Sequence, residues 1–300
     1  IGRINLTYAL TSTGTIRSEY TIVTLSENEF YLISAGAWTD YDSDYMRKLA
    51  DEKMNDFGYV EIHDVSTQRG VFAIAGPNSR KLLEGVLEAE NGADNISHKN
   101  FPWLSVKNIE IGMCPIVSIR VAYTGELGWE LHHPIEMQNY LFDLLMDAGT
   151  EYGLKLVGAR AQNWLRQEKS YRAFGTELGR DATILEANLE KFIDFNKPFL
   201  GKDALKKRSI NSKCVTLLID GPNDADPWGR EAIFFQNKNI GRLTSGGYSV
   251  AFNQSIGMGY VKPNFSKVGQ KVKVKILNKL WDAVITEDSP YDPKNLNIRC

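Results

Sequence analysis

Apolar and polar residues alternate through much of the first 65 positions, a spacing that places successive side chains on opposite faces of a strand. The pattern predicts strands at 4–10, 19–25, 29–34 and 59–65, and a helix at 44–57. Strands grouped around a helix indicate an α+β layer. Because the alternation is already established at Ile4, we expect further chain to precede Ile1.

The next part of the chain is dominated by helical spacing, with apolar residues at i, i+3 and i+4. It predicts helices at 79–87, 134–148, 159–170 and 184–192. The last of these begins at Thr183, and Glu186 follows three residues on, which is the spacing of a capping box. Strands at 71–75, 116–121 and 129–132 are interleaved with the helices, so an α/β layer is expected over 67–212.

Short β-prone runs replace the helical pattern after Lys213. They lie at 215–219, 231–235, 238–245, 255–261, 271–276 and 282–286. Clusters of Gly, Asn, Pro and Asp, which favour turns, separate the runs. This spacing predicts a small all-β domain, a barrel or a sandwich, over residues 213–300.

Composition narrows the kinds of partner. A formal net charge of −2 over 300 residues gives no electrostatic case for nucleic acid or an anionic membrane. The cysteines, Cys114, Cys214 and Cys300, stand far apart and fit neither a disulfide framework nor a paired zinc spacing, which favours a reducing compartment. No apolar run approaches the roughly 20 residues that span a bilayer. Since the net charge favours neither nucleic acid nor an anionic membrane, we expect a small-molecule or protein partner.

The stretch from Tyr123 to Glu130 places a tyrosine, two glycines and two carboxylates in what the flanking strands predict to be a hairpin. Glu130 stands between Trp129 and Leu131, where a carboxylate is costly unless a donor pairs with it. Either a buried arginine pairs with Glu130, or a ligand with two adjacent N–H donors, such as an aminopyrimidine edge, binds it in bidentate fashion. Glu19 is a second candidate, with a solvated charge on a strand edge as the alternative.

Other motifs exclude several kinds of site. Gly76 is a lone glycine after a strand, without the triple-glycine fingerprint of dinucleotide binding, and there is no phosphate-loop lysine pattern or nucleophile elbow. His132 and His133 are neighbours in a predicted strand and therefore point to opposite faces, which argues against a shared metal ion. We expect neither a nucleotide site nor a metal site.

Motifs spread along the whole chain resemble a single family. They are GTIRSEYTIVT at 14–24, GVFAIAGP at 70–77, YTGELGWEL at 123–131, LRQEKSYRAFG at 165–175, NKPFLGKDAL at 196–205, TSG at 244–246 and SPYDPKN at 289–295. On these motifs the chain resembles the folate-binding half of dimethylglycine and sarcosine dehydrogenases, which is related to the aminomethyltransferase, or T-protein, of the glycine cleavage system. Leu127, Trp129 and the segment 171–175 resemble the dehydrogenase branch more than T-proteins.

The resemblance implies a T-protein-like α+β fold, with mixed α/β layers followed by a small C-terminal β-barrel or sandwich. Residues 1–66 would form a partial folate-binding subdomain, because the family's first elements precede the region where Ile1 stands, and 67–212 would form a second one. It also implies a flavin domain upstream of this chain, whose FAD oxidises an N-methylamine.

The implied activity is enzymatic. Tetrahydrofolate captures a methylene iminium and gives 5,10-methylenetetrahydrofolate. Glu130 matches the family's pterin-binding glutamate, and Tyr123 matches a tyrosine of the same site. Glu19 falls where T-proteins place an aspartate near folate nitrogen ten, so a catalytic role in moving protons is expected for it. The T-protein arginine that helps to hold folate aligns with Gln162, and Arg160 lies two positions away.

Two other functions stay open: a stand-alone aminomethyltransferase that acts on a lipoyl carrier protein, and a folate-binding module without catalysis. The expected partners are folate, an iminium derived from an N-methylamine, and the upstream flavin domain, with no nucleic acid or membrane. A bacterial protein of this kind would be cytoplasmic, and a eukaryotic one would lie in the mitochondrial matrix.

Overall fold

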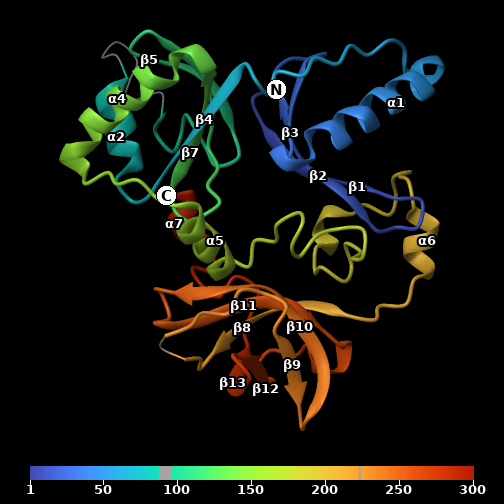
Figure 1. Ribbon diagram of the computed structural model, residues 1–300. Helices are drawn as coiled ribbons and strands as arrows, with labels where there is room; N and C mark the ends of the chain where they lie inside the picture. The colour runs from blue at the N-terminus through green and yellow to red at the C-terminus, as the bar shows by residue number, and fades with distance from the viewer. Residues whose placement is uncertain (88–95, 223) are drawn as a thin grey trace.

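The computed structural model describes residues 1–87, 96–222 and 224–300, which form three sheet-based parts (Figure 1). They are a three-stranded sheet, a four-stranded sheet and a closed six-stranded barrel. Helices accompany the two open sheets, and the barrel ends the chain. This architecture confirms the predicted α+β fold with a C-terminal all-β part, and it shows that this part is a barrel.

The first sheet is antiparallel, and α1 (Thr39–Phe57) covers one of its faces. Its strands lie in the order β1 (Ile4–Leu10), β2 (Ile16–Thr24) and β3 (Phe30–Ile33). Ser18 and Tyr20 of β2 donate hydrogen bonds to Asp42 of α1. Because side chains alternate along a strand, Glu19 faces away from α1.

The strand predicted at 59–65 does not form. Gly58 ends α1 with a φ of 84°, and the residues that follow it run irregularly to the second sheet. Tyr59 is 79% exposed and Val60 is 53% exposed. Alternation produces a stable strand only where one face becomes buried, and here neither apolar side chain has a layer to pack against.

A second stretch of sequence completes the first layer. Apolar side chains from residues 178–205 pack against Leu10 and Ile16 at one end of the first sheet. Those that are fully buried are Leu178, Ile184, Ala187, Leu189 and Leu205. Thr15 and Thr183 also form an isolated antiparallel bridge. Two separate stretches therefore build this layer, and the domain boundaries at 66 and 212 stay a prediction.

The helix predicted at 184–192 was wrong, although its capping box forms. The Thr183 amide donates to the Glu186 carboxylate at 3.1 Å, and the Glu186 amide donates to Thr183 Oγ1 at 3.1 Å. Asn188 then adopts a φ of 57°, which an α-helix does not accommodate. Only a 3-10 turn, η4 (Glu190–Phe192), follows.

The second sheet contains the predicted hairpin. Its strands lie in the order β4 (Arg69–Ala75), β7 (Gly128–Pro134), β6 (Cys114–Ile119) and β5 (Val106–Ile111), all antiparallel. Helices α2 (Ser79–Val86) and α4 (Gln138–Gly149) pack on one face, where Trp129 and Leu131 join Leu83 and Leu141 in the core. Glu130 lies between two of these core residues in β7 and so faces the opposite side.

The barrel confirms all six strands predicted after residue 213. They are β8 (Lys213–Ile219), β9 (Ala232–Phe235), β10 (Lys238–Ser249), β11 (Gln254–Val261), β12 (Lys271–Ile276) and β13 (Lys279–Ile285). Closure follows the order β10-β11-β8-β13-β12-β9, around an apolar interior that includes Leu217, Ile233 and Val274.

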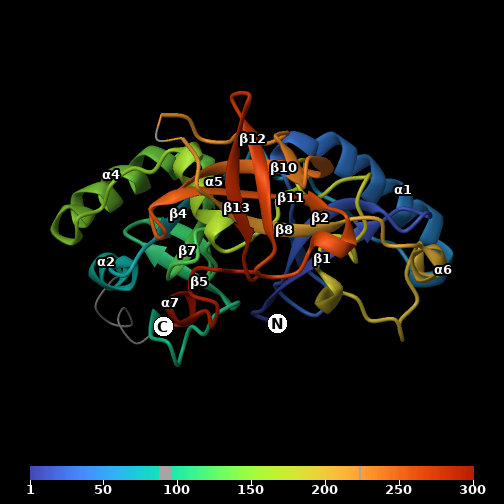
Figure 2. The same cartoon turned by 90° about the horizontal axis from the view of Figure 1, so that it is seen from below.

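The remaining elements are short helices and 3-10 turns. They are α5 (Ala159–Glu168), α6 (Lys202–Lys207), α7 (Leu296–Arg299), η1 (Gly36–Trp38), η2 (Ile135–Met137), η3 (Thr150–Tyr152) and η5 (Pro263–Phe265). Seen from below, the barrel lies in the middle, with α2 and α4 on one side and α1 and α6 on the other (Figure 2). Among the described residues, no helix is both long and apolar enough to cross a membrane.

Candidate functional site

The two open sheets face each other across a small apolar cluster. Ile4 and Val23 of the first sheet pack against Val106 and Ile119 of the second. Glu19 shares the inner face of β2 with Val23, because the two residues are four positions apart and side chains alternate along a strand. Glu130 stands opposite Ile119 in the β6–β7 register. Both predicted carboxylates therefore lie on the sheet faces that look toward each other.

Glu19 is set in a desolvated position next to a tyrosine. Tyr8 of β1 stands directly opposite Glu19 in the β1–β2 register, and its hydroxyl donates a hydrogen bond to the carboxylate. Burial raises the pKa of Glu19 to about 7, although the Tyr8 hydrogen bond works in the other direction. A carboxyl group that titrates near neutral pH can both accept and donate a proton under physiological conditions.

Tyr123 stands at the start of the turn between β6 and β7. Its hydroxyl donates to the carbonyl oxygen of Arg172 at 3.1 Å, and its ring stacks on Tyr171 with centroids 5.9 Å apart. Burial raises the pKa of Tyr123, and the nearby charges of Arg166 and Glu19 also act on it. These contacts tie the Tyr123 side chain to the loop that contains Tyr171 and Arg172.

Glu130 has a histidine partner. His132 Nε2 lies 3.3 Å from Glu130 Oε2, and the Glu130 side chain is 31% exposed. Of the two readings that the sequence left open, the pairing with a buried arginine is wrong for the part of the chain that the structure describes. One carboxylate oxygen carries the protein contact, which leaves acceptor capacity for a ligand.

The two adjacent histidines point to opposite faces of β7, as the strand geometry predicts. His132 contacts Tyr31 of β3, at 3.0 Å between Nδ1 and the hydroxyl. His133 lies on the helix side, where it stacks on Phe72 with ring centroids 4.8 Å apart. No group of three or more His, Cys, Asp or Glu residues in the described ranges could hold a metal ion.

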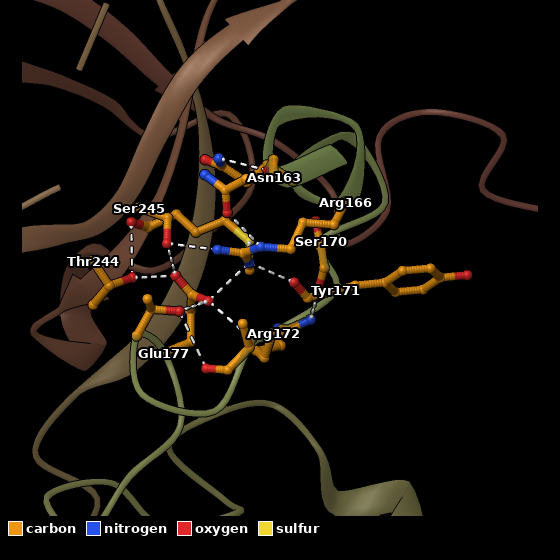
Figure 3. Close-up of polar contacts among 12 residues, drawn as sticks. Asn163, Arg166, Ser170, Tyr171, Arg172, Glu177, Thr244 and Ser245 are labelled. Carbon is orange, nitrogen blue, oxygen red and sulfur yellow. Dashed lines mark hydrogen bonds and ion pairs between the residues drawn. The ribbon is translucent and has the colours of Figure 1, made fainter. Parts of the chain in front are cut away.

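A buried polar network ties the site to the barrel (Figure 3). Arg166 of α5 donates to Glu177 Oε2 at 2.9 Å and to Ser245 of β10 at 2.7 Å. Thr244 also donates to Glu177, at 2.7 Å. Burial alone would raise the pKa of Glu177, but Arg166 and the hydroxyl donors hold it below its usual value. The network fixes the loop that carries Tyr171.

Arg172 is anchored in the same loop. Its guanidinium donates to both carboxylate oxygens of Asp288, at 3.0 and 2.9 Å, and to the carbonyl of Ser170 at 2.6 Å. A bidentate pair fixes the orientation of the guanidinium plane as well as its position. Because the Arg172 carbonyl accepts the Tyr123 hydroxyl, this anchor also orients Tyr123.

The two glycines of the hairpin turn are required by close packing. Gly125 has a φ of 81°, and a Cβ there would collide with the side chain of Lys169. At Gly128, a Cβ would lie 2.7 Å from the carbonyl oxygen of Ile74. The buried Lys169 ammonium in turn donates to the carbonyls of Tyr291 and Asp292 at 3.0 and 2.7 Å. The motifs at 123–131 and 289–295 therefore meet in space.

Gln162 and Arg160 lie at the start of α5, and both are exposed. Arg160 extends over the rings of Trp164 and Trp228, at 5.0 and 4.9 Å, and lies 3.5 Å from an Asp226 carboxylate oxygen. Arg160 is therefore a surface residue that contacts two tryptophans and an aspartate, and none of these contacts is with Glu19 or Glu130.

A cavity of about 850 Å³ opens between the first layer and the barrel. Its lining combines aromatic residues with four arginines: Arg17, Trp38, Tyr41, Phe174, Gly175, Thr176, Leu178, Gly179, Arg180, Asp181, Arg230, Arg242, Leu243 and Thr244. Neither Glu19 nor Glu130 lines this cavity. Two of its lining residues, Thr176 and Thr244, connect it to the polar network, because each donates to the buried Glu177 at 2.7 Å.

Sequence reasoning missed Tyr8 and His132, which stand beside Glu19 and Glu130, and Tyr31, which contacts His132. Tyr8 and Tyr31 read as ordinary members of alternating strands, and His132 was considered only as a metal ligand. For Tyr8, the missing information was the register that sets it opposite Glu19. His132 had an available signal, because a residue two positions after Glu130 in a strand must share its face.

The fold and this arrangement define a T-protein-like module. The chain belongs to the glycine cleavage T-protein family: residues 1–197 match the family model described as the GCVT N-terminal domain, and residues 213–292 match the glycine cleavage T-protein C-terminal barrel domain.

The relatives that are similar to this chain include dehydrogenases and aminomethyltransferases. The mitochondrial dimethylglycine dehydrogenase of Homo sapiens is 38% identical over 96% of the chain, which spans about a third (33%) of that protein. An aminomethyltransferase of Caldanaerobacter subterraneus is 33% identical over 88% of the chain and 68% of its own length. The crystal structure of aminomethyltransferase T from Bartonella henselae has a TM-score of 0.80 at 21% identity, covering 97% of the chain and 77% of its own, and it supports the fold.

Proposed function

We propose that this chain is the tetrahydrofolate-dependent part of a demethylating dehydrogenase of the dimethylglycine or sarcosine type. In this function, the chain transfers the methylene group of an iminium to tetrahydrofolate, which yields 5,10-methylenetetrahydrofolate and releases the demethylated amine and a proton. The observation that carries the proposal is the pair of carboxylates on facing sheets. Glu130 is partly exposed beside a histidine, and Glu19 is desolvated with a pKa of about 7.

The residues present fit a reduced pterin. An aminopyrimidine edge offers two parallel N–H donors, which match the two oxygens of a carboxylate. Glu130 retains acceptor capacity, because His132 contacts only Oε2. The aromatic rings of Tyr123 and Tyr171 lie nearby in a stacked pair and offer apolar surface to a planar ligand. When bound, tetrahydrofolate supplies the nucleophilic nitrogen atoms.

Glu19 is the residue that would move protons. Formation of a carbon–nitrogen bond at an amine nitrogen requires that nitrogen to lose a proton, and a carboxylate with a pKa of about 7 can accept it. Tyr8 stands opposite Glu19 in the β1–β2 register, and its hydroxyl acts to lower the pKa of this carboxyl group. The desolvated setting of Glu19 also limits competing hydrolysis by water.

The relatives support an upstream oxidising domain. This chain spans only about a third of the human dimethylglycine dehydrogenase and of a protein named 4-methylaminobutanoate oxidase (formaldehyde-forming) from Paenarthrobacter nicotinovorans, to which it is 28% identical. We propose that the intact protein carries an FAD-containing domain that generates the iminium from an N-methylamine. A eukaryotic form would lie in the mitochondrial matrix, like the mitochondrial human relative, and a bacterial form would lie in the cytoplasm.

A stand-alone aminomethyltransferase is the second candidate, favoured by the 33% identity to the Caldanaerobacter enzyme. The two functions differ in the donor of the carbon unit. Sarcosine and formaldehyde condense to an iminium when they are mixed. If the first function is correct, the chain should transfer the carbon unit of this iminium to tetrahydrofolate. The second predicts transfer from an aminomethylated lipoyl carrier protein. The initial rate of transfer is measured with each donor, and the rate without protein is subtracted. The donor that gives the faster transfer decides between the two functions.

Calorimetry with tetrahydrofolate tests the site itself. Truncation of a hydrogen-bonded charged group typically costs 2–5 kcal/mol, so Glu130→Ala should weaken binding at least about thirtyfold. Glu136→Ala, an exposed carboxylate on the turn after β7, is the matched control and should leave the affinity unchanged. Equal affinities for the wild type and Glu130→Ala would remove the pterin assignment.

A further inference from the structure

A chain of polar contacts runs from the first sheet to Glu130. The Tyr31 hydroxyl of β3 lies 3.0 Å from His132 Nδ1, and His132 Nε2 lies 3.3 Å from Glu130 Oε2. The Tyr31 and His132 rings meet edge to face, with centroids 5.4 Å apart and planes at 89°. The His132 side chain is only 1% exposed, so water does not compete for its two nitrogens.

The chemistry of the groups fixes the direction of these hydrogen bonds. An ionised carboxylate only accepts, so the proton between Glu130 and His132 belongs to Nε2. A neutral imidazole with a proton on Nε2 has a bare, accepting Nδ1. With His132 neutral, the Tyr31 hydroxyl is the donor at that end. The order of donation is therefore Tyr31 to His132 to Glu130.

We propose that Tyr31 and His132 are positioning residues that orient the Glu130 carboxylate for its ligand. The imidazole holds Oε2 in one place and leaves Oε1, together with the second lone pair of Oε2, directed to the space between the sheets. Without this contact, the carboxylate of a partly exposed glutamate rotates among several rotamers. The inference rests on the proposed function, because Glu130 is the group that is positioned.

The Tyr31–His132 contact also makes the orientation of the Glu130 carboxylate depend on how the two sheets pack. His132 and Glu130 belong to β7 of the second sheet, whereas Tyr31 belongs to β3, an edge strand of the first. In register, Tyr31 stands opposite Val23, which packs in the cluster between the sheets. A shift of the first sheet therefore withdraws the donor that fixes the His132 tautomer.

The adjacent histidine provides a matched control. His133 is as buried as His132, in the same strand, but it faces α4 and stacks on Phe72. In calorimetry, His132→Phe should weaken tetrahydrofolate binding about tenfold, the equivalent of one hydrogen bond to a charged group. His133→Phe, which keeps the stacked ring, should leave the affinity unchanged.

Rescue separates positioning from packing. A glutamine at position 132 can accept from Tyr31 through its carbonyl and donate to Glu130 through its amide, so His132→Gln should recover most of the affinity lost in His132→Phe. If Gln and Phe lower the affinity equally, the role of His132 is only to fill space. Tyr31→Phe should weaken binding less than His132→Phe, because it removes the more distant donor.

Nitrogen chemical shifts test the direction of the hydrogen bonds. In ¹⁵N-histidine-labelled protein at pH 8, the signal that disappears in His132→Gln should show a protonated Nε2 and an unprotonated Nδ1. The opposite tautomer would overturn the proposed order. Failure here is distinct from failure of the pterin assignment. If Glu130→Ala weakens folate binding but His132→Phe does not, the positioning role falls and the proposed function stands.

Discussion

Replacing the buried carboxyl of Glu19 should stabilise the fold in a pH-dependent way. In the folded protein, burial raises the pKa of Glu19 from an ordinary value of 4.5 to about 7. The folded state therefore holds this proton more tightly than the unfolded state does. As the pH rises from about 4.5 to about 7, the unfolded chain releases the proton first, and the free energy of unfolding falls.

The magnitude follows from the two pKa values. A difference of one in pKa between the folded and unfolded states corresponds to about 1.36 kcal/mol. The full loss in the free energy of unfolding is therefore about 3 kcal/mol, and it is complete above pH 7. Glu19→Gln has no carboxyl group to charge and escapes this loss. Relative to the wild type, the variant should gain up to about 3 kcal/mol between pH 4.5 and pH 8.

Urea unfolding at pH 5, 6, 7 and 8 measures this difference. The quantity of interest is the free energy of unfolding of Glu19→Gln minus that of the wild type, because the contributions of all other groups cancel. Glu29→Gln, a change at an exposed glutamate before β3, is the control and should give a difference that does not vary with pH. A difference for Glu19→Gln that is also constant would show that Glu19 is not desolvated.

The same variant should be slower in catalysis. General acid–base groups typically contribute ~10²–10⁴-fold, so single-turnover transfer should slow by that order, while tetrahydrofolate affinity stays near that of the wild type. Greater stability combined with a slower reaction is the pattern expected of a group kept in an unfavourable environment for function. Unchanged single-turnover rates would refute the catalytic role of Glu19.

Two further predictions concern the packing that supports the site. Gly125→Ala should lower the stability by about 1–3 kcal/mol in thermal unfolding, because the backbone there has a φ of 81°; Gly158→Ala, at a φ of −78° with open space around it, should be neutral. Glu177→Met should cost about 3–5 kcal/mol in urea unfolding, because it leaves the buried Arg166 without its carboxylate; Lys273→Met, which breaks an exposed pair, should cost at most about 1 kcal/mol.

The sequence predicts best where structure depends on local pattern. The barrel strands emerge from short β-prone runs between turn residues, and each of them is present. The prediction at 184–192 fails because a local signal was read without its surroundings. The Thr183–Glu186 box forms, but the apolar residues that follow pack against Leu10 and Ile16 in the first layer instead of continuing a helix. Tertiary packing overrides propensity there.

The site shows the same division between local and distant information. That Glu130 and Trp129 face opposite sides of β7 follows from strand periodicity alone, and the core around Trp129 confirms it. The identity of the partner of His132 required a second strand, since Tyr31 lies about a hundred residues away from His132 in sequence. The position of Tyr8 opposite Glu19 likewise depends on the pairing of two strands, β1 and β2.

The two carboxylates illustrate how one protein gives the same functional group two different tasks. Glu19 lies in a desolvated setting that raises its pKa to about 7, so that its neutral and ionised forms are both populated near neutral pH. Glu130 remains partly open to solvent and receives an N–H donor from an imidazole, a setting that suits an acceptor-only group. Environments that differ in this way are the basis on which we propose proton transfer for one carboxylate and recognition for the other. Because the two groups belong to different sheets, neither task can be performed until the first layer and the second sheet pack together.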